Sequence, residues 1–231
     1  MNDNATLPSE VNLDSLFHRR SIFGSVEKLS EAGFQIVKGS TDRVTVFGHA
    51  SLPGYLFKKF LRTCKRPPKK LIGYYEKRVQ GARSLKAHLD DLDINSIVVP
   101  RKWLCELPSR CCYEDEPKYI IIVEKYNLLK HEESLQRYRH IPKSTIRDLC
   151  TIFFTFKGVD FAAKNMPFTS DGKIACVDTG CFQRITEDLS FRRDNYRKHV
   201  ERLHVKLHTG ESKRYADALW DVFKKHGVPY R

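Results

Sequence analysis

The stretch TIRDLCTIFFTFKGVDFAAKNMPFTSDGKIACVDTGCF, residues 145–182, carries the pattern that decides the fold of this chain. Its apolar residues first recur at helical spacing, which predicts a buried helix that stops at Lys157-Gly158. A polar loop follows, and two short apolar runs, 165–168 and 173–177, then flank an Asp-Gly step. An Asp-Gly between two such runs is typical of a β-hairpin. The stretch therefore predicts a helix, a loop and a hairpin in succession.

Three polar side chains in this stretch have the spacing that phosphoryl transfer requires. Asp160 and Asn165 stand at the two ends of DFAAKN, and Asp178 follows the predicted hairpin. The reaction needs one carboxylate beside the acceptor hydroxyl, and an amide and a second carboxylate that hold Mg²⁺ on the phosphates. Taken singly, each residue has an ordinary alternative role, as a helix cap, a turn residue or a strand end.

The three residues together resemble the catalytic core of protein kinases, in which H-R-D-x-x-x-x-N is followed, beyond a hairpin, by D-F-G. The resemblance implies that Asp160 receives the proton of the acceptor hydroxyl, and that Asn165 and Asp178 bind Mg²⁺. It also implies that ATP is the phosphate donor. Thr179 departs from the family pattern, since it stands in place of the phenylalanine of D-F-G.

Other departures indicate an abbreviated kinase. Val159 stands where the family has the arginine that reads a phosphorylated activation loop, and Ala162 where it has a lysine near the transferred phosphate. Too few residues follow Gly180 for a long activation segment and a complete helical lobe. The chain is therefore similar to small bacterial effector kinases, which keep the catalytic core and discard most of the C-terminal lobe. We expect its activity to be independent of activation-loop phosphorylation.

The residues before this core predict an antiparallel sheet. Short β-type runs, separated by turn sequences, lie at 34–37, 44–47 and 55–60. By the kinase resemblance, the first turn would cover the nucleotide phosphates with Gly39 and Ser40, although the Gly-rich motif is absent. The third strand would carry the lysine that binds the phosphates, Lys58. Lys59 competes for this role, but alternation along a strand would place the two lysines on opposite faces.

A long helix is predicted over 69–92, after two prolines that break the chain. Its apolar residues form one shared stripe. The kinase resemblance makes it the αC helix, in which Glu76 would form an ion pair with Lys58. The alternative is that Glu76 is an exposed helix carboxylate beside Lys77.

The run YIIIVEKY, residues 119–126, predicts a strand that is buried on both faces. In a kinase this strand leads into the hinge between the lobes, and the hinge backbone contacts the adenine. The resemblance thus implies that Glu124 and Tyr126 line the nucleotide site.

These patterns predict an α+β fold, namely a protein-kinase-like two-lobe fold with an antiparallel sheet in the N-lobe and an abbreviated helical C-lobe. Residues 1–33 would form an N-terminal tail and packing helix, 34–126 the N-lobe, and 127–231 the C-lobe with the catalytic loop. The expected function is ATP- and Mg²⁺-dependent transfer of the γ-phosphate to a hydroxyl, with a protein as the first candidate acceptor. A catalytically impaired pseudokinase scaffold is the main alternative, because the Gly-rich motif is missing.

The formal net charge of +13 indicates attraction to acidic or phosphate-rich partners. An acidic protein substrate, a nucleic acid and an anionic lipid surface all fit this charge. A basic nucleic-acid-binding module is therefore the second alternative, although the sequence has no zinc-finger or aromatic RNP signature. Nucleotide-dependent thermal stabilisation would distinguish the two kinase-like functions from this module.

The sequence also bears on cellular location. It has no apolar run long enough to cross a bilayer and no secretory signal at its start. Its seven cysteines are an odd number, which favours free thiols in a reducing compartment. We therefore expect a cytoplasmic protein, and the resemblance to effector kinases adds delivery from a bacterium into a host cell.

Overall fold

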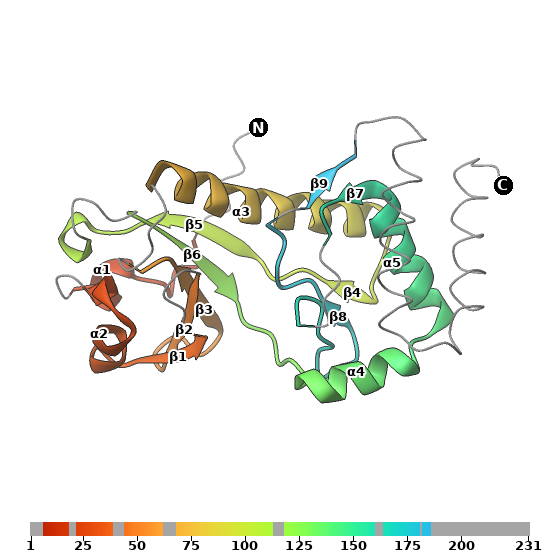
Figure 1. Cartoon of the computed structure of the whole chain (residues 1–231), viewed down its shortest axis with the longest axis horizontal. Helices are drawn as coiled ribbons and strands as arrows, with labels where there is room; N and C mark the ends of the chain where they lie inside the picture. Colours follow the sequence, from red (N-terminus) through yellow and green to blue (C-terminus); the bar gives the residue numbers. More distant parts are fainter. Residues whose placement is uncertain are drawn as a thin grey trace. The chain divides into compact units, whose positions relative to one another are not determined.

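The computed structural model describes residues 7–18, 22–38, 44–61, 68–112, 118–159, 164–180 and 182–185 (Figure 1). These residues belong to two compact units. The first unit takes residues 1–80 and 101–125, and the second takes residues 81–100 and 126–231. The part of the predicted C-lobe beyond residue 185 lies outside the described residues.

A five-stranded antiparallel sheet forms the centre of the first unit. Its strands, in chain order, are β1 (Phe34–Lys38), β2 (Thr45–His49), β3 (Tyr55–Lys59), β5 (Lys102–Glu106) and β6 (Tyr119–Glu124). They are arranged in the order β1-β2-β3-β6-β5, and every neighbouring pair is antiparallel. The predicted three-stranded meander is therefore confirmed, as is the buried strand predicted at 119–126, although β6 ends at Glu124.

One face of this sheet is covered by the N-terminal segment. The segment folds into three short elements: α1 (Leu13–Leu16), the 3₁₀ turn η1 (Ile22–Gly24) and α2 (Val26–Glu31). Large aromatic side chains dominate the contact. The Phe17 ring stacks on Phe34 at 5.4 Å between centroids and meets Phe57 of β3 edge-on at 5.6 Å. Because such rings bury large apolar areas, the N-terminal segment belongs to the core of the first unit.

The other face of the sheet is covered by α3 (Pro68–Asp91), which confirms the long helix predicted over 69–92 (Figure 1). The side chains in this contact come from one stripe of α3 and from β6: Leu71, Tyr75, Val79, Ile121 and Val123. The Tyr75 hydroxyl also accepts a 2.8 Å hydrogen bond from the backbone N–H of Phe60, just beyond β3. Neither α3 nor any other helix in the described residues is long and apolar enough to cross a membrane.

The described residues of the second unit comprise the C-terminal end of α3, two further helices and two small sheets. The further elements are α4 (His131–Arg139), α5 (Lys143–Thr155), β4 (Ile97–Val98), β7 (Phe156–Lys157), β8 (Ile174–Ala175) and β9 (Gln183–Arg184). β4 pairs with β8 in parallel, and β7 pairs with β9 in antiparallel orientation.

The helix predicted from the central stretch is α5, and it is more deeply buried than α4, the other described helix that lies wholly in this unit. Its apolar side chains enter a single core: Ile146, Leu149, Cys150, Ile152, Phe153 and Phe154. α5 ends at Thr155, earlier than the predicted stop at Lys157-Gly158. The reason is that Phe156 and Lys157 pair with β9 and so adopt extended backbone.

The hairpin predicted at the Asp-Gly step is present. Phe168 and Ile174 form an antiparallel bridge, and the Thr169 N–H donates a 2.8 Å hydrogen bond to the Lys173 carbonyl oxygen. Gly172 in the turn has a φ of 88°, a left-handed conformation that glycine adopts without steric cost. The Asp-Gly step therefore forms the turn that brings the two runs together.

Candidate functional site

Lys58 lies on the face of the sheet that α3 covers. It stands opposite Val46 of β2 and Ile121 of β6 in the strand register. Directly opposite residues share one face of a sheet, and Ile121 is fully buried in the cluster that α3 forms with β6. Lys58 itself is half-buried. The structure thus places the candidate phosphate-binding lysine on the α3 side.

Lys59 lies on the opposite face, beneath the N-terminal segment. Its side chain is 0% exposed, and its Nζ lies 4.7 Å from the centroid of the Phe23 ring. Nζ also donates a 3.5 Å hydrogen bond to the Tyr119 carbonyl oxygen. The predicted separation of the two lysines by strand alternation is therefore confirmed. A ligand bound on the Lys58 face is out of reach of Lys59.

Glu76 is not paired with Lys58 in this structure. Its neighbour Tyr75 takes the buried position on α3, and Glu76 is exposed. None of the described residues forms an ion pair or a hydrogen bond with its carboxylate. The structure therefore shows Glu76 as an exposed helix carboxylate, the alternative that the sequence left open.

Glu124 ends β6 and is tied to the start of β5. Its carboxylate pairs with the Arg101 guanidinium at 3.1 Å and also accepts a 3.2 Å hydrogen bond from the Arg101 backbone N–H. Its own N–H donates to the Arg101 carbonyl oxygen at 3.0 Å, and the next N–H, of Lys125, donates to Gly54 at 2.8 Å. The Glu124 side chain is therefore held within the first unit. Tyr126, the other predicted adenine contact, is half-buried and begins the second unit.

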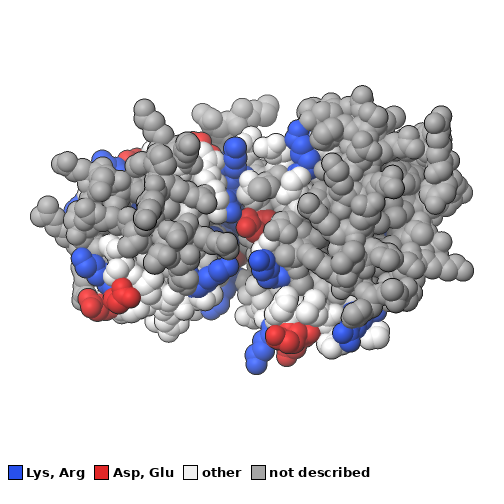
Figure 2. Space-filling view, viewed as in Figure 1, with Lys and Arg blue, Asp and Glu red and all other residues white. Residues whose placement is uncertain are grey.

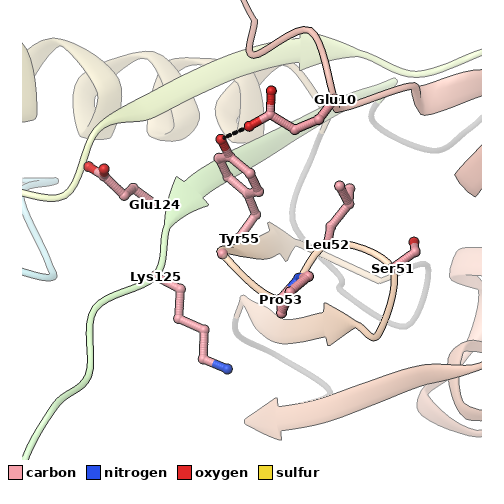
Figure 3. Close-up of a pocket in the computed structure, with 8 residues that line it drawn as sticks. Glu10, Ser51, Leu52, Pro53, Tyr55, Glu124 and Lys125 are labelled. Atoms are coloured by element: carbon pink, nitrogen blue, oxygen red, sulfur yellow. Dashed lines mark hydrogen bonds between the residues drawn. The ribbon is translucent and has the colours of Figure 1, made fainter.

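A shallow cavity of about 470 Å³ lies at this end of the sheet (Figure 3). It is lined by Glu10, Ser51, Leu52, Pro53, Gly54, Tyr55, Glu124 and Lys125. The Tyr55 hydroxyl donates a 2.5 Å hydrogen bond to the Glu10 carboxylate. This bond lowers the pKa of Glu10 and raises the pKa of Tyr55, because it favours the carboxylate and the neutral phenol.

The cavity is not on the Lys58 face. Tyr55 and Leu52 pack with the aromatic cluster beneath the N-terminal segment, and alternation along β3 puts Tyr55 on the face of Lys59. No sequence pattern predicts the cavity, because its lining comes from three segments that carry no shared motif.

Asn165 and Asp178, the two candidate Mg²⁺ ligands, are brought together in the second unit. The Val177 N–H, one residue before Asp178, donates a 3.0 Å hydrogen bond to the Asn165 carbonyl oxygen. The Ala175 N–H donates to the Pro167 carbonyl oxygen at 2.8 Å, so these bonds continue the hairpin away from its turn. Both candidate ligands are half-buried. The hairpin therefore brings the backbone of these two residues together at its open end.

The segment that leads to Asp178 is hydrogen-bonded to β4, and Asp178 itself takes part in a local turn. The Cys176 N–H donates to the Val98 carbonyl oxygen at 2.9 Å, beside the parallel pairing of β4 and β8. Asp178 Oδ1 accepts a 3.2 Å hydrogen bond from the Gly180 N–H, which closes a turn at Asp-Thr-Gly. Thr179 between them is 0% exposed. The backbone on each side of the candidate carboxylate is thus hydrogen-bonded.

Pairing of β7 with β9 joins the segment before Asp160 to the segment after Asp178. Lys157 stands opposite Gln183, and Val159 and Phe182 are buried in the same core. Asp160 itself lies outside the described residues, as do Gly39 and Ser40 of the first predicted turn.

An amide oxygen and a carboxylate are a donor set that suits Mg²⁺. This ion prefers oxygen ligands and is usually held by one or two protein groups together with water and phosphate oxygens. Within the described residues, no group of three or more His, Cys, Asp or Glu side chains is placed to hold a metal ion. Asn165 and Asp178 are thus ligand types that suit Mg²⁺, and a site built on them would have to be completed by water and phosphate oxygens.

Comparison with known proteins identifies no family or curated relative of the chain. No protein-family model matches the chain, and a search of curated proteins finds no significant match. The likeness to protein kinases therefore rests on the residues and their arrangement.

Proposed function

We propose that the chain is an ATP- and Mg²⁺-dependent phosphotransferase with a protein-kinase-like fold. The observation that carries the proposal is the 3.0 Å hydrogen bond between the Val177 N–H and the Asn165 carbonyl oxygen, which holds the backbone of Asn165 next to the residue before Asp178. Asn165 and Asp178 would together supply the amide and carboxylate oxygens that a phosphate-bound Mg²⁺ requires.

The first unit supports the proposal through the position of Lys58. β3, which carries Lys58, pairs directly with β6, which ends at the predicted hinge residue Glu124. Lys58 and Glu124 therefore belong to adjacent strands, with Lys58 on the α3 face and the Glu124 side chain at the cavity on the other face. A lysine ammonium at Lys58 would neutralise phosphate charge as a point charge.

The roles in the proposed reaction follow from the chemistry of each group. Mg²⁺, bound by Asn165 and Asp178, would neutralise charge on the phosphates. Asp160 would accept the proton of the acceptor hydroxyl, whose oxygen forms the new bond to the γ-phosphorus while the bond to ADP breaks. Lys58 would hold the phosphates of the donor.

A protein with an acidic surface is an acceptor that fits the charge of the chain. The net charge is +13, and Figure 2 shows basic side chains on the described surface of both units with acidic ones among them. Long-range attraction by such a surface raises the association rate with acidic partners. None of the described cysteines forms a disulfide bond, which suits a reducing compartment.

A pseudokinase that binds nucleotide without transferring phosphate is the second candidate. The exposed position of Glu76 favours it, since in active kinases this helix carboxylate forms an ion pair with the phosphate-binding lysine, and Glu76 does not pair with Lys58. Binding of ATP together with the absence of phosphate transfer would distinguish this candidate from an active enzyme.

Thermal unfolding with ATP and Mg²⁺ tests the proposal. A ligand that binds only the native state raises the free energy of unfolding, by about 2.7 kcal/mol at a hundred times its Kd. We expect the parent chain to be stabilised and Asn165→Ala to lose the Mg²⁺-dependent part of this shift. Asn127→Ala is the matched control, because Asn127 is an exposed asparagine of the same unit. Equal stabilisation of parent and Asn165→Ala would contradict the metal assignment.

A further inference from the structure

Gly81 of α3 makes an unusually close backbone contact with the Asp178 turn. A Cβ atom placed on Gly81 would lie 2.2 Å from the Thr179 carbonyl oxygen and 3.2 Å from that of Phe182. Both groups and Gly81 belong to the second unit. Carbonyl oxygens are backbone atoms and cannot rotate away from the added carbon as a flexible side chain could. Any residue larger than glycine at this position must therefore displace either α3 or the turn.

The helix cannot easily yield at this contact. Ala82, Leu85 and Leu89 follow Gly81 on the same helix, and all three are buried in the core of the second unit. Movement of α3 away from the turn would open this core, and close-packed interiors resist such shifts.

The turn would yield instead, and Asp178 would move with it. Thr179 is covalently bonded to Asp178, and the Gly180 N–H on its other side donates to Asp178 Oδ1 at 3.2 Å. The Phe182 N–H donates to the Thr179 carbonyl oxygen at 3.2 Å, the same oxygen that faces Gly81. A displacement of Thr179 would therefore disturb the bond that orients the Asp178 carboxylate.

A second glycine of α3 shows that this requirement is local. Nothing lies within 4 Å of a Cβ placed on Gly73. Glycine is less favourable than alanine inside a helix, because it loses more backbone entropy on folding. A side chain at position 73 would meet no other atom, whereas a side chain at position 81 would overlap the Thr179 carbonyl oxygen.

We propose that Gly81 is a positioning residue that sets the orientation of the Asp178 carboxylate toward its metal ion. The claim rests on the proposed function for the identity of the metal, but the effect of Gly81 on the turn is independent of it. Gly81 touches neither metal nor nucleotide in this account, and it acts through Thr179 and Gly180.

The test compares Gly81→Ala with the matched control Gly73→Ala, each labelled with [¹⁵N]glycine. The Gly180 amide reports on the Asp178 turn, since it is the donor to the carboxylate. We expect Gly81→Ala to shift the Gly180 signal and Gly73→Ala to leave it unchanged. In nucleotide-dependent thermal stabilisation, Gly81→Ala should raise the half-saturating Mg²⁺ concentration by about tenfold or more. Loss of a group that orients a metal ligand typically weakens metal affinity by that factor. The stabilisation by ATP without metal should stay unchanged.

Two results would overturn the proposal. One is an unshifted Gly180 signal in folded Gly81→Ala, and the other is a Mg²⁺ dependence equal to that of the parent. A parent chain that shows no response to Mg²⁺ and ATP would instead remove the proposed function, and with it the metal role of Gly81.

If Gly81→Ala fails to fold, the labelled parent protein provides a second test. Adding Mg²⁺ to the nucleotide-bound parent should then shift the signals of both Gly81 and Gly180 and leave Gly73 unchanged. An unmoved Gly81 signal beside a shifted Gly180 signal would count against the proposal.

Discussion

Lys58 and Lys59 are adjacent in β3, yet they lie on opposite faces of the sheet. Lys58 stands opposite Ile121 on the face covered by α3, whereas Lys59 is fully buried beneath the N-terminal segment with its ammonium over the Phe23 ring. Two residues of the same type and the same strand thus have different environments. The pair offers an internal comparison of function and stability.

Lys58→Ala should weaken ATP binding by roughly tenfold or more, since a hydrogen bond to a charged group is worth about 1.5–3 kcal/mol. Its free energy of unfolding should change by no more than about 0.5 kcal/mol, as for other sites without deep burial. Lys59→Ala should show the reverse pattern, with ATP affinity retained and about 1–3 kcal/mol of stability lost. Isothermal titration with ATP and urea unfolding measure the two quantities. A larger loss of ATP affinity in Lys59→Ala would show that the nucleotide face is assigned wrongly.

The hydrogen bond between Tyr55 and Glu10 should make stability depend on pH in the acid range. The bond holds the pKa of Glu10 below its ordinary value of 4.5, so its stabilising effect is present above pH 4.5 and is lost as pH falls through the native pKa. Tyr55→Phe should therefore lower the melting temperature at pH 7 and lower it by less at pH 2.5.

Tyr119→Phe is the control for this comparison, because the Tyr119 phenol makes no hydrogen bond to the residues that the structure describes. It should have the same small effect at both pH values. A Tyr55→Phe effect that persists undiminished at pH 2.5 would argue against the pair with Glu10.

Cys105 and Cys111 should react slowly with alkylating reagents in the folded protein. Desolvation by burial raises the pKa of each thiol to about 11, and the thiolate is the reactive form. At pH 8 only a very small fraction of either thiol is therefore ionised. Iodoacetamide labelling followed by peptide mass spectrometry should find both cysteines protected in buffer and modified in urea. Rapid modification of either thiol in buffer would contradict their placement.

Phosphate transfer should not depend on prior phosphorylation of the enzyme. Val159 stands where kinases that are regulated by activation-loop phosphorylation carry an arginine. Its side chain is only 2% exposed in the core of the second unit. An apolar buried residue offers no charge to a phosphorylated loop. Protein treated with phosphatase should transfer phosphate at the rate of untreated protein. Loss of activity that returns on autophosphorylation would contradict this expectation.

Local patterns predicted the parts of the fold whose signals lie close together in the sequence. Apolar residues at helical spacing predicted α3 and α5, and the Asp-Gly step predicted the hairpin that brings Asn165 to Asp178. Alternation along one strand was enough to separate Lys58 from Lys59. In each case the structure depends on neighbours within a few residues.

Contacts between distant segments could not be predicted in this way. β7 and β9 have two residues each and lie far apart in the chain, so neither shows a periodic pattern. The Glu10–Tyr55 bond joins a loop to a strand without any motif. Glu76 shows the same limit, because helical spacing places a residue on a face but does not decide whether a carboxylate there meets a lysine. Gly81 is visible in the sequence only as a glycine inside a helical pattern, which is a weak signal. The close approach of the Thr179 carbonyl oxygen, which explains the glycine, comes from a distant turn.

Transfer of labelled γ-phosphate from ATP, in the presence of Mg²⁺, tests the central claim most directly. The parent chain should label itself or an acidic acceptor protein, and Asp178→Asn should reduce the rate by about 100-fold or more, because it removes the charge that binds the metal. Asp171→Asn is the matched control, since Asp171 is an exposed aspartate at the turn of the same hairpin, and it should transfer phosphate like the parent. Equal rates for parent and Asp178→Asn, or no transfer by the parent at all, would contradict the account.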